Sequence, residues 1–178
     1  NPAMIADAII LDASLLLRLP PKICAATGID ALAHAIECYT SNKATPFSDL
    51  FALGALKLIH ANLWKAYDEP DCLEAKRNML LASFYAGVSI AAAGTTAVHA
   101  LSYPLGGKYH IAHGVSNAML LATVMRFNMP CCKERLAEVY QTLYPERPLE
   151  SCEAEAEFVI CWLEKTVRHL EIPDNLRS

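Results

Sequence analysis

After the adjacent prolines Pro20 and Pro21, the whole chain has apolar spacing typical of α-helices, divided by proline and glycine. Capping residues or first-turn prolines mark where the predicted helices begin, and Gly94 suits the left-handed turn that ends one of them. The sequence therefore predicts an all-α fold, a multi-helix bundle of six or seven helices. The predicted helices are residues 21–41; 45–67, with Thr45 as N-cap and Pro46 at the first helical position; 71–93, capped by Asp71; 96–103, ending before Pro104; 114–128; 130–143; and a last helix capped by Glu150 or Ser151 that ends before Pro173.

The segment before the prolines has a different pattern. Ala8–Asp12 is a short apolar run bounded by aspartates, which predicts one short buried strand. No other predicted strand is present to pair with it, so we expect it to belong to a sheet outside this chain. The predicted domain organisation is an exit segment at residues 1–20 and a helical domain at residues 21–178.

Charge and composition narrow the class of protein. The 178 residues are 54% hydrophobic and 19% charged, as in a globular protein, and the formal net charge is −4. Because no Lys/Arg cluster occurs, we expect neither nucleic acid nor an anionic membrane as partner. No run approaches the roughly 20 apolar residues of a membrane span, and no secretory signal is visible. Seven cysteines without a C-x-x-C spacing indicate reduced thiols and a cytoplasmic protein.

The segment GIDALAHAIECYTS, residues 28–41, carries the first candidate site. Asp30 and His34 lie four residues apart, so on a helix both project on the same side. Because a buried charge is costly unless it is paired or bound to a cation, this pair predicts either a metal site or a hydrogen-bonded Asp–His pair near a helix N-terminus.

Two further histidines favour the metal site. His99 and His113 flank Pro104, Gly106 and Gly107, a predicted turn that would fold the chain back on itself. Three imidazoles and one carboxylate suit Fe²⁺ or Zn²⁺ better than Mg²⁺ or Ca²⁺, and a thiolate-free set is typical of catalytic sites.

The other histidines are predicted to have different surroundings. His60 has apolar neighbours at helical spacing, and His169 lies in the last turn of a helix, where a cation is favourable, so neither is interpreted as a site residue. His110 lies three residues before His113 and is either a pocket residue or a loop histidine.

These motifs, together with RNMLLASFYAGVSIAAAGTTAVHALSYPLGGKYHIAHGVSNAMLL, closely resemble the helical C-terminal domain of the iron-containing alcohol dehydrogenase family. That domain has the fold also found in dehydroquinate synthase. The resemblance covers essentially the whole chain and implies Asp30, His34, His99 and His113 as ligands of a divalent metal, Fe²⁺ or alternatively Zn²⁺.

The resemblance also implies a second cofactor and a reaction. Family members bind NAD(P) in an N-terminal domain, and none of the seven glycines here forms the glycine-rich phosphate loop of such a domain. The chain thus resembles the metal-binding domain without most of its cofactor-binding half, and by the same resemblance we expect it to be truncated at its C-terminus. The implied reaction is metal-assisted hydride transfer between NAD(P) and a small alcohol or aldehyde. We expect this chain to be inactive alone. The sequence leaves the oligomeric state open, and a homo-oligomer is one possibility.

One position departs from the family pattern. Many members carry a histidine four residues after the third ligand, near the nicotinamide, where this chain has Tyr103. Tyrosine releases its proton less readily than histidine near neutral pH, so Tyr103 is interpreted either as an altered catalytic residue or as a ring packed on Pro104.

Two alternatives remain at this point. The first is a non-redox metal enzyme resembling dehydroquinate synthase, although Asp30 and the HALSYPLGG motif favour the dehydrogenase branch. The second is a helical metal-binding module without catalysis of its own.

Overall fold

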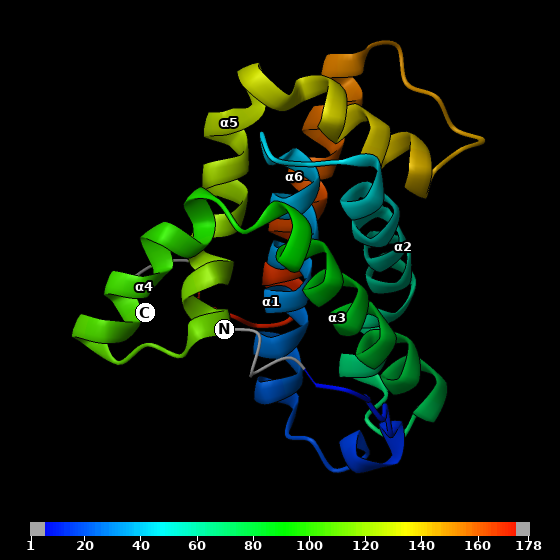
Figure 1. Cartoon of the computed structure of the whole chain (residues 1–178), viewed down its shortest axis with the longest axis vertical. Helices are drawn as coiled ribbons and strands as arrows, with labels where there is room; N and C mark the ends of the chain where they lie inside the picture. Colours follow the sequence, from blue (N-terminus) through cyan, green and yellow to red (C-terminus); the bar gives the residue numbers. More distant parts are fainter. Residues whose placement is uncertain (1–5, 174–178) are drawn as a thin grey trace.

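Residues 6–173 are described by a computed structural model, and they form six α-helices and one short 3-10 helix (Figure 1). No strand occurs within these residues, so the predicted all-α class is confirmed. In chain order the elements are η2 (Ala13–Leu16), α1 (Pro21–Thr40), α2 (Pro46–Asp68), α3 (Leu73–Ala93), α4 (Ala97–Tyr109), α5 (His113–Leu143) and α6 (Cys152–His169).

The predicted strand at Ala8–Asp12 is wrong. These residues are irregular, and the side chain of Ile10 is 92% exposed. A strand exists only through hydrogen bonds to a neighbour, and no neighbour is available within residues 6–173. Asp12 instead accepts a hydrogen bond from the backbone N–H of Ser14, at 2.9 Å, and so caps η2.

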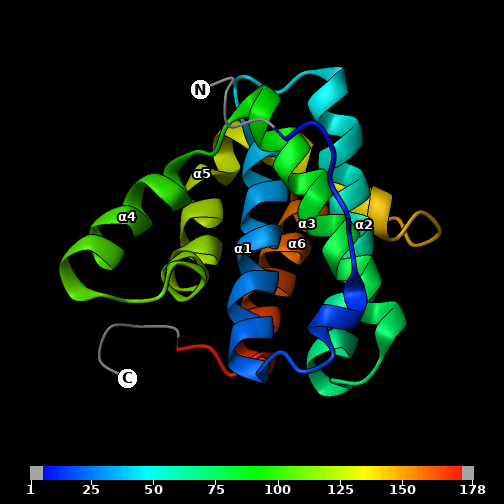
Figure 2. The same cartoon turned by 60° about the horizontal axis from the view of Figure 1, so that its bottom comes forward.

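Helix α1 is the central element of the bundle. In Figure 2 it lies between α4 and α5 on one side and α2 and α3 on the other. Its residues Ile29, Leu32 and Ile36 are completely buried in the main hydrophobic core. A Cβ at Gly28 would lie 2.3 Å from Leu63 Cδ1, so the absence of a side chain allows α1 and α2 to pack closely.

The predicted helix ends are partly confirmed. Thr45 and Ser48 form a capping box before α2, Ser151 caps α6, and Gly94 follows α3 with a positive φ of 69°. The predicted Asp71 cap is wrong, because the N-cap position of α3 is Cys72.

The predicted end of the fourth helix before Pro104 is wrong. Helix α4 continues to Tyr109 with Pro104 inside it, so the PLGG segment is helical and is not the turn. Proline removes one hydrogen bond, the one to the Ala100 carbonyl, but both residues are exposed and water can satisfy that carbonyl. The chain reverses after Tyr109, where His110 adopts the left-handed conformation with φ 57°.

Helix α5 contains the two helices predicted at residues 114–128 and 130–143. They are joined into one bent element, and the interruption is the non-helical residue Cys132, with φ −136° and ψ 22°, two residues after Pro130. The predicted interruption is therefore confirmed, but it is a kink within one helix and does not separate two helices.

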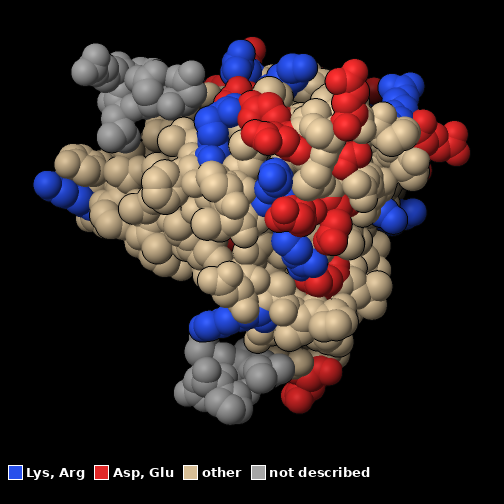
Figure 3. All heavy atoms as spheres, turned by 90° about the horizontal axis from the view of Figure 1, so that it is seen from above, with Lys and Arg blue, Asp and Glu red and all other residues tan. Residues whose placement is uncertain are grey.

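Charged side chains of both signs lie next to one another on part of the surface. Figure 3 shows acidic and basic side chains interspersed over one half of the visible face, and few on the half where α4 projects. Among residues 6–173, no single helix is long and apolar enough to cross a membrane. Only α3 and α4 taken together meet the length and composition test, across a bend of 106°.

Candidate metal centre

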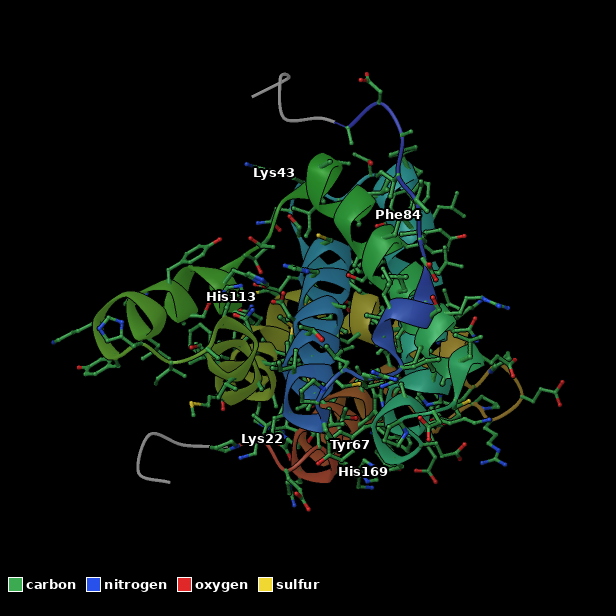
Figure 4. The ribbon with its side chains drawn as sticks, turned by 90° about the horizontal axis from the view of Figure 1, so that it is seen from below. Lys22, Lys43, Tyr67, Phe84, His113 and His169 are labelled. Carbon is green, nitrogen blue, oxygen red and sulfur yellow. The ribbon has the colours of Figure 1, made fainter. Side chains whose placement is uncertain are left out.

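The side chains that the sequence singled out for metal binding meet where three helices converge. Asp30 and His34 come from α1, His99 from α4, and His113 is the first residue of α5. Figure 4 shows His113 between α4 and α1. The Nε2 atoms of His113, His99 and His34 lie 3.4, 3.5 and 3.8 Å from Asp30 Oδ1.

A close backbone approach brings α5 to this position. A Cβ at Gly114 would lie 2.1 Å from the carbonyl oxygen of Ala26, which no side chain could tolerate. Because His113 precedes Gly114 and Asp30 lies one helical turn after Ala26, this contact sets the His113 ring beside the Asp30 carboxylate.

The spacing of these atoms fits a small divalent ion. A tetrahedral site with metal–ligand bonds of about 2.0–2.2 Å has ligand atoms roughly 3.3–3.6 Å apart. The distances from Asp30 Oδ1 to His99 and His113 lie in this range, and the ligand atoms of the three residues all lie within 4.8 Å of one another. His34 is not part of that group. Its ring stacks on the His99 ring, with centroids 4.6 Å apart.

Asn117, which the sequence interpretation missed, lies inside this cluster. Its Nδ2 atom is 2.6 Å from Asp30 Oδ1 and 3.2 Å from the Nε2 atoms of both His99 and His113. Its Oδ1 atom is buried and has no hydrogen-bond partner among the described residues. The amide thus contacts the three atoms that a cation would use. The available signal was its position four residues after His113, the same spacing as Asp30 and His34.

Glu37 was also missed, although it lies on the same face of α1, seven residues after Asp30. This carboxylate is completely buried, and its Oε2 atom forms a short hydrogen bond with Nδ1 of His99. Its Oε1 atom accepts hydrogen bonds from the backbone N–H groups of Thr96 and Val98, at 3.0 and 2.8 Å, and from the Thr96 hydroxyl.

The electrostatics favour a positive charge in the cluster. Burial alone would raise the pKa of Asp30, but His99, His34 and Asn117 outweigh it, so the pKa lies below its ordinary value. Burial alone would lower the pKa of His99, but Asp30 and Glu37 raise it to about 9. The pKa of His34 is lowered, chiefly by burial. The carboxylates of Asp30 and Glu37 therefore stabilise the positively charged form of His99, which lies between them.

The two other predicted site residues lie differently. The Tyr103 ring stacks on the His113 ring, with centroids 5.8 Å apart, and it is 63% exposed at the edge of the cluster. It contacts a site histidine, which a ring packed only on Pro104 would not do. His110 is exposed at the end of α4, and within the described residues no hydrogen bond, salt bridge or aromatic pair joins it to the cluster.

The two histidines that were not interpreted as site residues have local partners. His60 Nε2 lies 2.6 Å from the Tyr144 hydroxyl, and its ring lies against Trp162. His169 stacks on Trp64 and hydrogen-bonds to Asp68. Figure 4 shows His169 close to Tyr67 and well away from His113.

Comparison with known proteins identifies relatives of the whole helical region. Residues 24–178 match the family model described as Fe-containing alcohol dehydrogenase family, C-terminal. Long-chain-alcohol dehydrogenase 1 of Geobacillus thermodenitrificans is 42% identical over 174 residues, which are 97% of this chain and 44% of that protein.

Solved structures agree with the sequence matches. A 1,3-propanediol oxidoreductase superimposes with a TM-score of 0.89 at 36% identity, covering 93% of this chain and 44% of its own. An iron-containing alcohol dehydrogenase from Thermococcus thioreducens gives a TM-score of 0.86 at 29% identity, covering 97% and 43%. The chain therefore spans less than half the length of these relatives.

Proposed function

The chain belongs to the Fe-containing alcohol dehydrogenase family, and we propose that it is the metal-binding part of an NAD(P)-linked alcohol dehydrogenase or aldehyde reductase. The proposed substrate is a small alcohol or aldehyde, in line with the name of the 1,3-propanediol oxidoreductase. The Geobacillus relative is instead named for long-chain alcohols. The nicotinamide cofactor is proposed to bind mainly to residues outside this chain, which covers 44% of the length of the Geobacillus relative.

The proposed ligands are Asp30, His34, His99 and His113, and the proposed metal is Fe²⁺, with Zn²⁺ as the alternative. The observation that carries this proposal is the spacing of 3.4 and 3.5 Å between Asp30 Oδ1 and the two imidazole Nε2 atoms. Three nitrogen donors and one oxygen donor suit both metals. The amide of Asn117 must give up its contacts with these atoms, or turn, when an ion binds between them.

A divalent ion in this position supplies Lewis acidity toward the oxygen of an alcohol or carbonyl group. The protein groups prepare the site for it. Asp30 contributes the negative charge that holds a cation, and α1, α4 and α5 each position one of the three imidazoles. The His113 side chain is 43% exposed while the His99 side chain is 3% exposed, so the open side of the site is the His113 side.

Tyr103 lies on that open side. Because its ring stacks on His113, we propose that its hydroxyl donates a hydrogen bond to the substrate oxygen. His110, exposed at the end of α4, is the weaker of the two candidates.

Metal content tests the ligand assignment. His99→Ala and His113→Ala in the full-length protein are expected to lose stoichiometric metal in elemental analysis after anaerobic purification. His60→Ala is the matched control, because His60 is also a helical histidine, with a burial between those of His99 and His113, and it contacts Tyr144 and Trp162 instead. Unchanged metal content in both site variants would overturn the assignment.

Activity tests the reaction class. The full-length protein is expected to reduce NAD or NADP when supplied with a primary alcohol, and the 178 residues alone are expected to show no turnover. Turnover by the isolated chain would contradict the proposal that the cofactor binds elsewhere. A full-length protein that binds metal but oxidises no alcohol would favour a non-redox metal enzyme.

A further inference from the structure

The buried carboxylate of Glu37 performs two tasks at once. One oxygen meets His99, and the other meets the N-terminus of α4, the helix that carries His99. Helix α4 has no capping hydrogen bond from its own N-cap residue, Thr96. A carboxylate supplied by α1 therefore accepts the free N–H groups at this helix end, where a negative charge is favourable.

Complete burial makes these contacts necessary. A carboxylate without solvent contact is stable only when its charge is compensated and its oxygens accept hydrogen bonds. The salt bridges of the described residues give Glu37 a single partner, the His99 ring. The remaining compensation comes from the α4 N-terminus. The Glu37 side chain, the His99 ring and the N-terminus of α4 thus form one hydrogen-bonded unit.

The consequence concerns which ring nitrogen of His99 faces the cluster. Glu37 accepts at Nδ1, so Nδ1 keeps its proton, and in the neutral ring the lone pair lies on Nε2. Nε2 is the atom that lies 3.5 Å from Asp30 Oδ1 and 3.2 Å from Asn117 Nδ2. In metal sites the partner of the second ring nitrogen fixes ring orientation and raises ligand basicity.

We propose that Glu37 is a positioning residue that fixes the tautomer and orientation of His99 for metal binding while capping α4. This inference rests on the proposed function, since it assigns a role at the same metal site. It differs from the view that Glu37 only stabilises the fold.

Glu37→Gln separates the two tasks. Glutamine has the same shape but one acceptor oxygen, and the α4 N-terminus offers three donors against one from His99. The oxygen is expected to stay with Thr96 and Val98, so that the amide NH₂ faces Nδ1. The ring must then accept at Nδ1 and carry its proton on Nε2, the wrong atom for a ligand.

The chain offers two matched controls. Glu155 is also buried, at 4% exposure, and its carboxylate accepts from Gln141 and from the backbone N–H of Leu149, so Glu155→Gln makes the same change away from histidine. Thr96→Val removes one donor from the helix end of Glu37 and leaves the His99 contact in place.

The experiment measures Zn²⁺ affinity of the full-length protein by competition with a chelating dye. Glu37→Gln is expected to weaken it about 10- to 100-fold, while Glu155→Gln and Thr96→Val stay within about threefold of the unsubstituted protein. Circular dichroism of the metal-free proteins checks folding. Zn²⁺ affinity of Glu37→Gln within threefold of the unsubstituted protein would overturn the inference.

A second measurement keeps the inference testable if Glu37→Gln does not fold. In the zinc-loaded, unsubstituted protein, ¹⁵N-histidine NMR is expected to show a proton on His99 Nδ1 at unusually low field. A His99 ring without a proton on Nδ1 would overturn the inference and leave the proposed function standing. An unsubstituted protein that binds no Zn²⁺ and no Fe²⁺ would instead overturn the proposed function, and the inference with it.

Discussion

The two faces of helix α1 have opposite requirements. On the core face, Ile29, Leu32 and Ile36 are completely buried among other apolar side chains, and only volume and shape matter. On the metal face, Asp30 and Glu37 depend on individual atoms that come from α4 and α5. The difference indicates that substitutions on one face change stability and substitutions on the other change ligand binding.

Gly114→Ala is expected to have the largest effect, because it disturbs the junction between α1 and α5 and so affects both faces. The new Cβ would meet backbone atoms of Ala26, 2.1 Å from the carbonyl oxygen, and backbone cannot rotate away. We expect a loss of about 3 kcal/mol or more in the free energy of unfolding, measured in urea, together with loss of metal binding. Gly87→Ala is the control, since a Cβ there meets nothing within 4 Å. Equal stability of the two variants would show that α5 can move away from α1 without cost.

Ile36→Ala against Asp30→Asn tests the comparison directly. Removing the completely buried Ile36 side chain is expected to cost about 3 kcal/mol of stability and to leave Zn²⁺ affinity nearly unchanged. Asp30→Asn keeps the shape of the side chain but removes its negative charge. It is expected to lower the free energy of unfolding of the metal-free protein by about 1–2 kcal/mol and to abolish metal binding. If Ile36→Ala lost metal as completely as Asp30→Asn, the two faces would not be separable.

His60 shows that a histidine outside the metal cluster has a smaller, pH-dependent effect. Burial lowers its pKa, so the unfolded chain binds a proton more readily than the folded protein. The stability that neutral His60 contributes is therefore present above about pH 6.5, its unfolded pKa, and is lost as the pH falls toward the folded value.

His60→Gln is expected to remove this part of the pH dependence, so that the variant loses less stability than the unsubstituted protein between pH 7.5 and pH 5.5. Glutamine can still hydrogen-bond the Tyr144 hydroxyl. Urea unfolding of both metal-free proteins at several pH values gives the difference between them, in which the contributions of other histidines cancel. Parallel stability profiles would mean that His60 titrates alike in the folded and unfolded states.

Local rules were enough to predict several parts of this molecule from its sequence. The capping residues Thr45 and Ser151 act within one turn of the chain, and their helices begin where predicted. The candidate ligands Asp30, His34, His99 and His113 could be selected because an imidazole or a carboxylate on an apolar helix needs a partner or a cation. Residue type and spacing alone therefore predict the helix caps and the candidate ligands, without knowledge of how the helices pack.

Glu37 and Asn117 could not be selected in the same way. Glu37 acts on Thr96 and Val98, about sixty residues further along the chain, and nothing in the sequence states that the α4 N-terminus would meet α1 there. A glutamate on a helix is usually solvated, so its burial had no local signal. The roles of both residues depend on how three helices pack.

Pro104→Ala is expected to have the smallest effect and tests where the metal face ends. The substitution restores an N–H that can bond the Ala100 carbonyl, but it also increases the conformational entropy of the unfolded chain. Because α4 is already helical through this position, the two effects nearly cancel, and we expect stability to change by less than about 1 kcal/mol. Zn²⁺ affinity should stay within threefold, since His99 is held by Glu37 at the start of α4. Hydrogen exchange should show a protected amide at position 104. A large loss of affinity would show that Pro104 helps to position His99, and the metal face would then extend along α4.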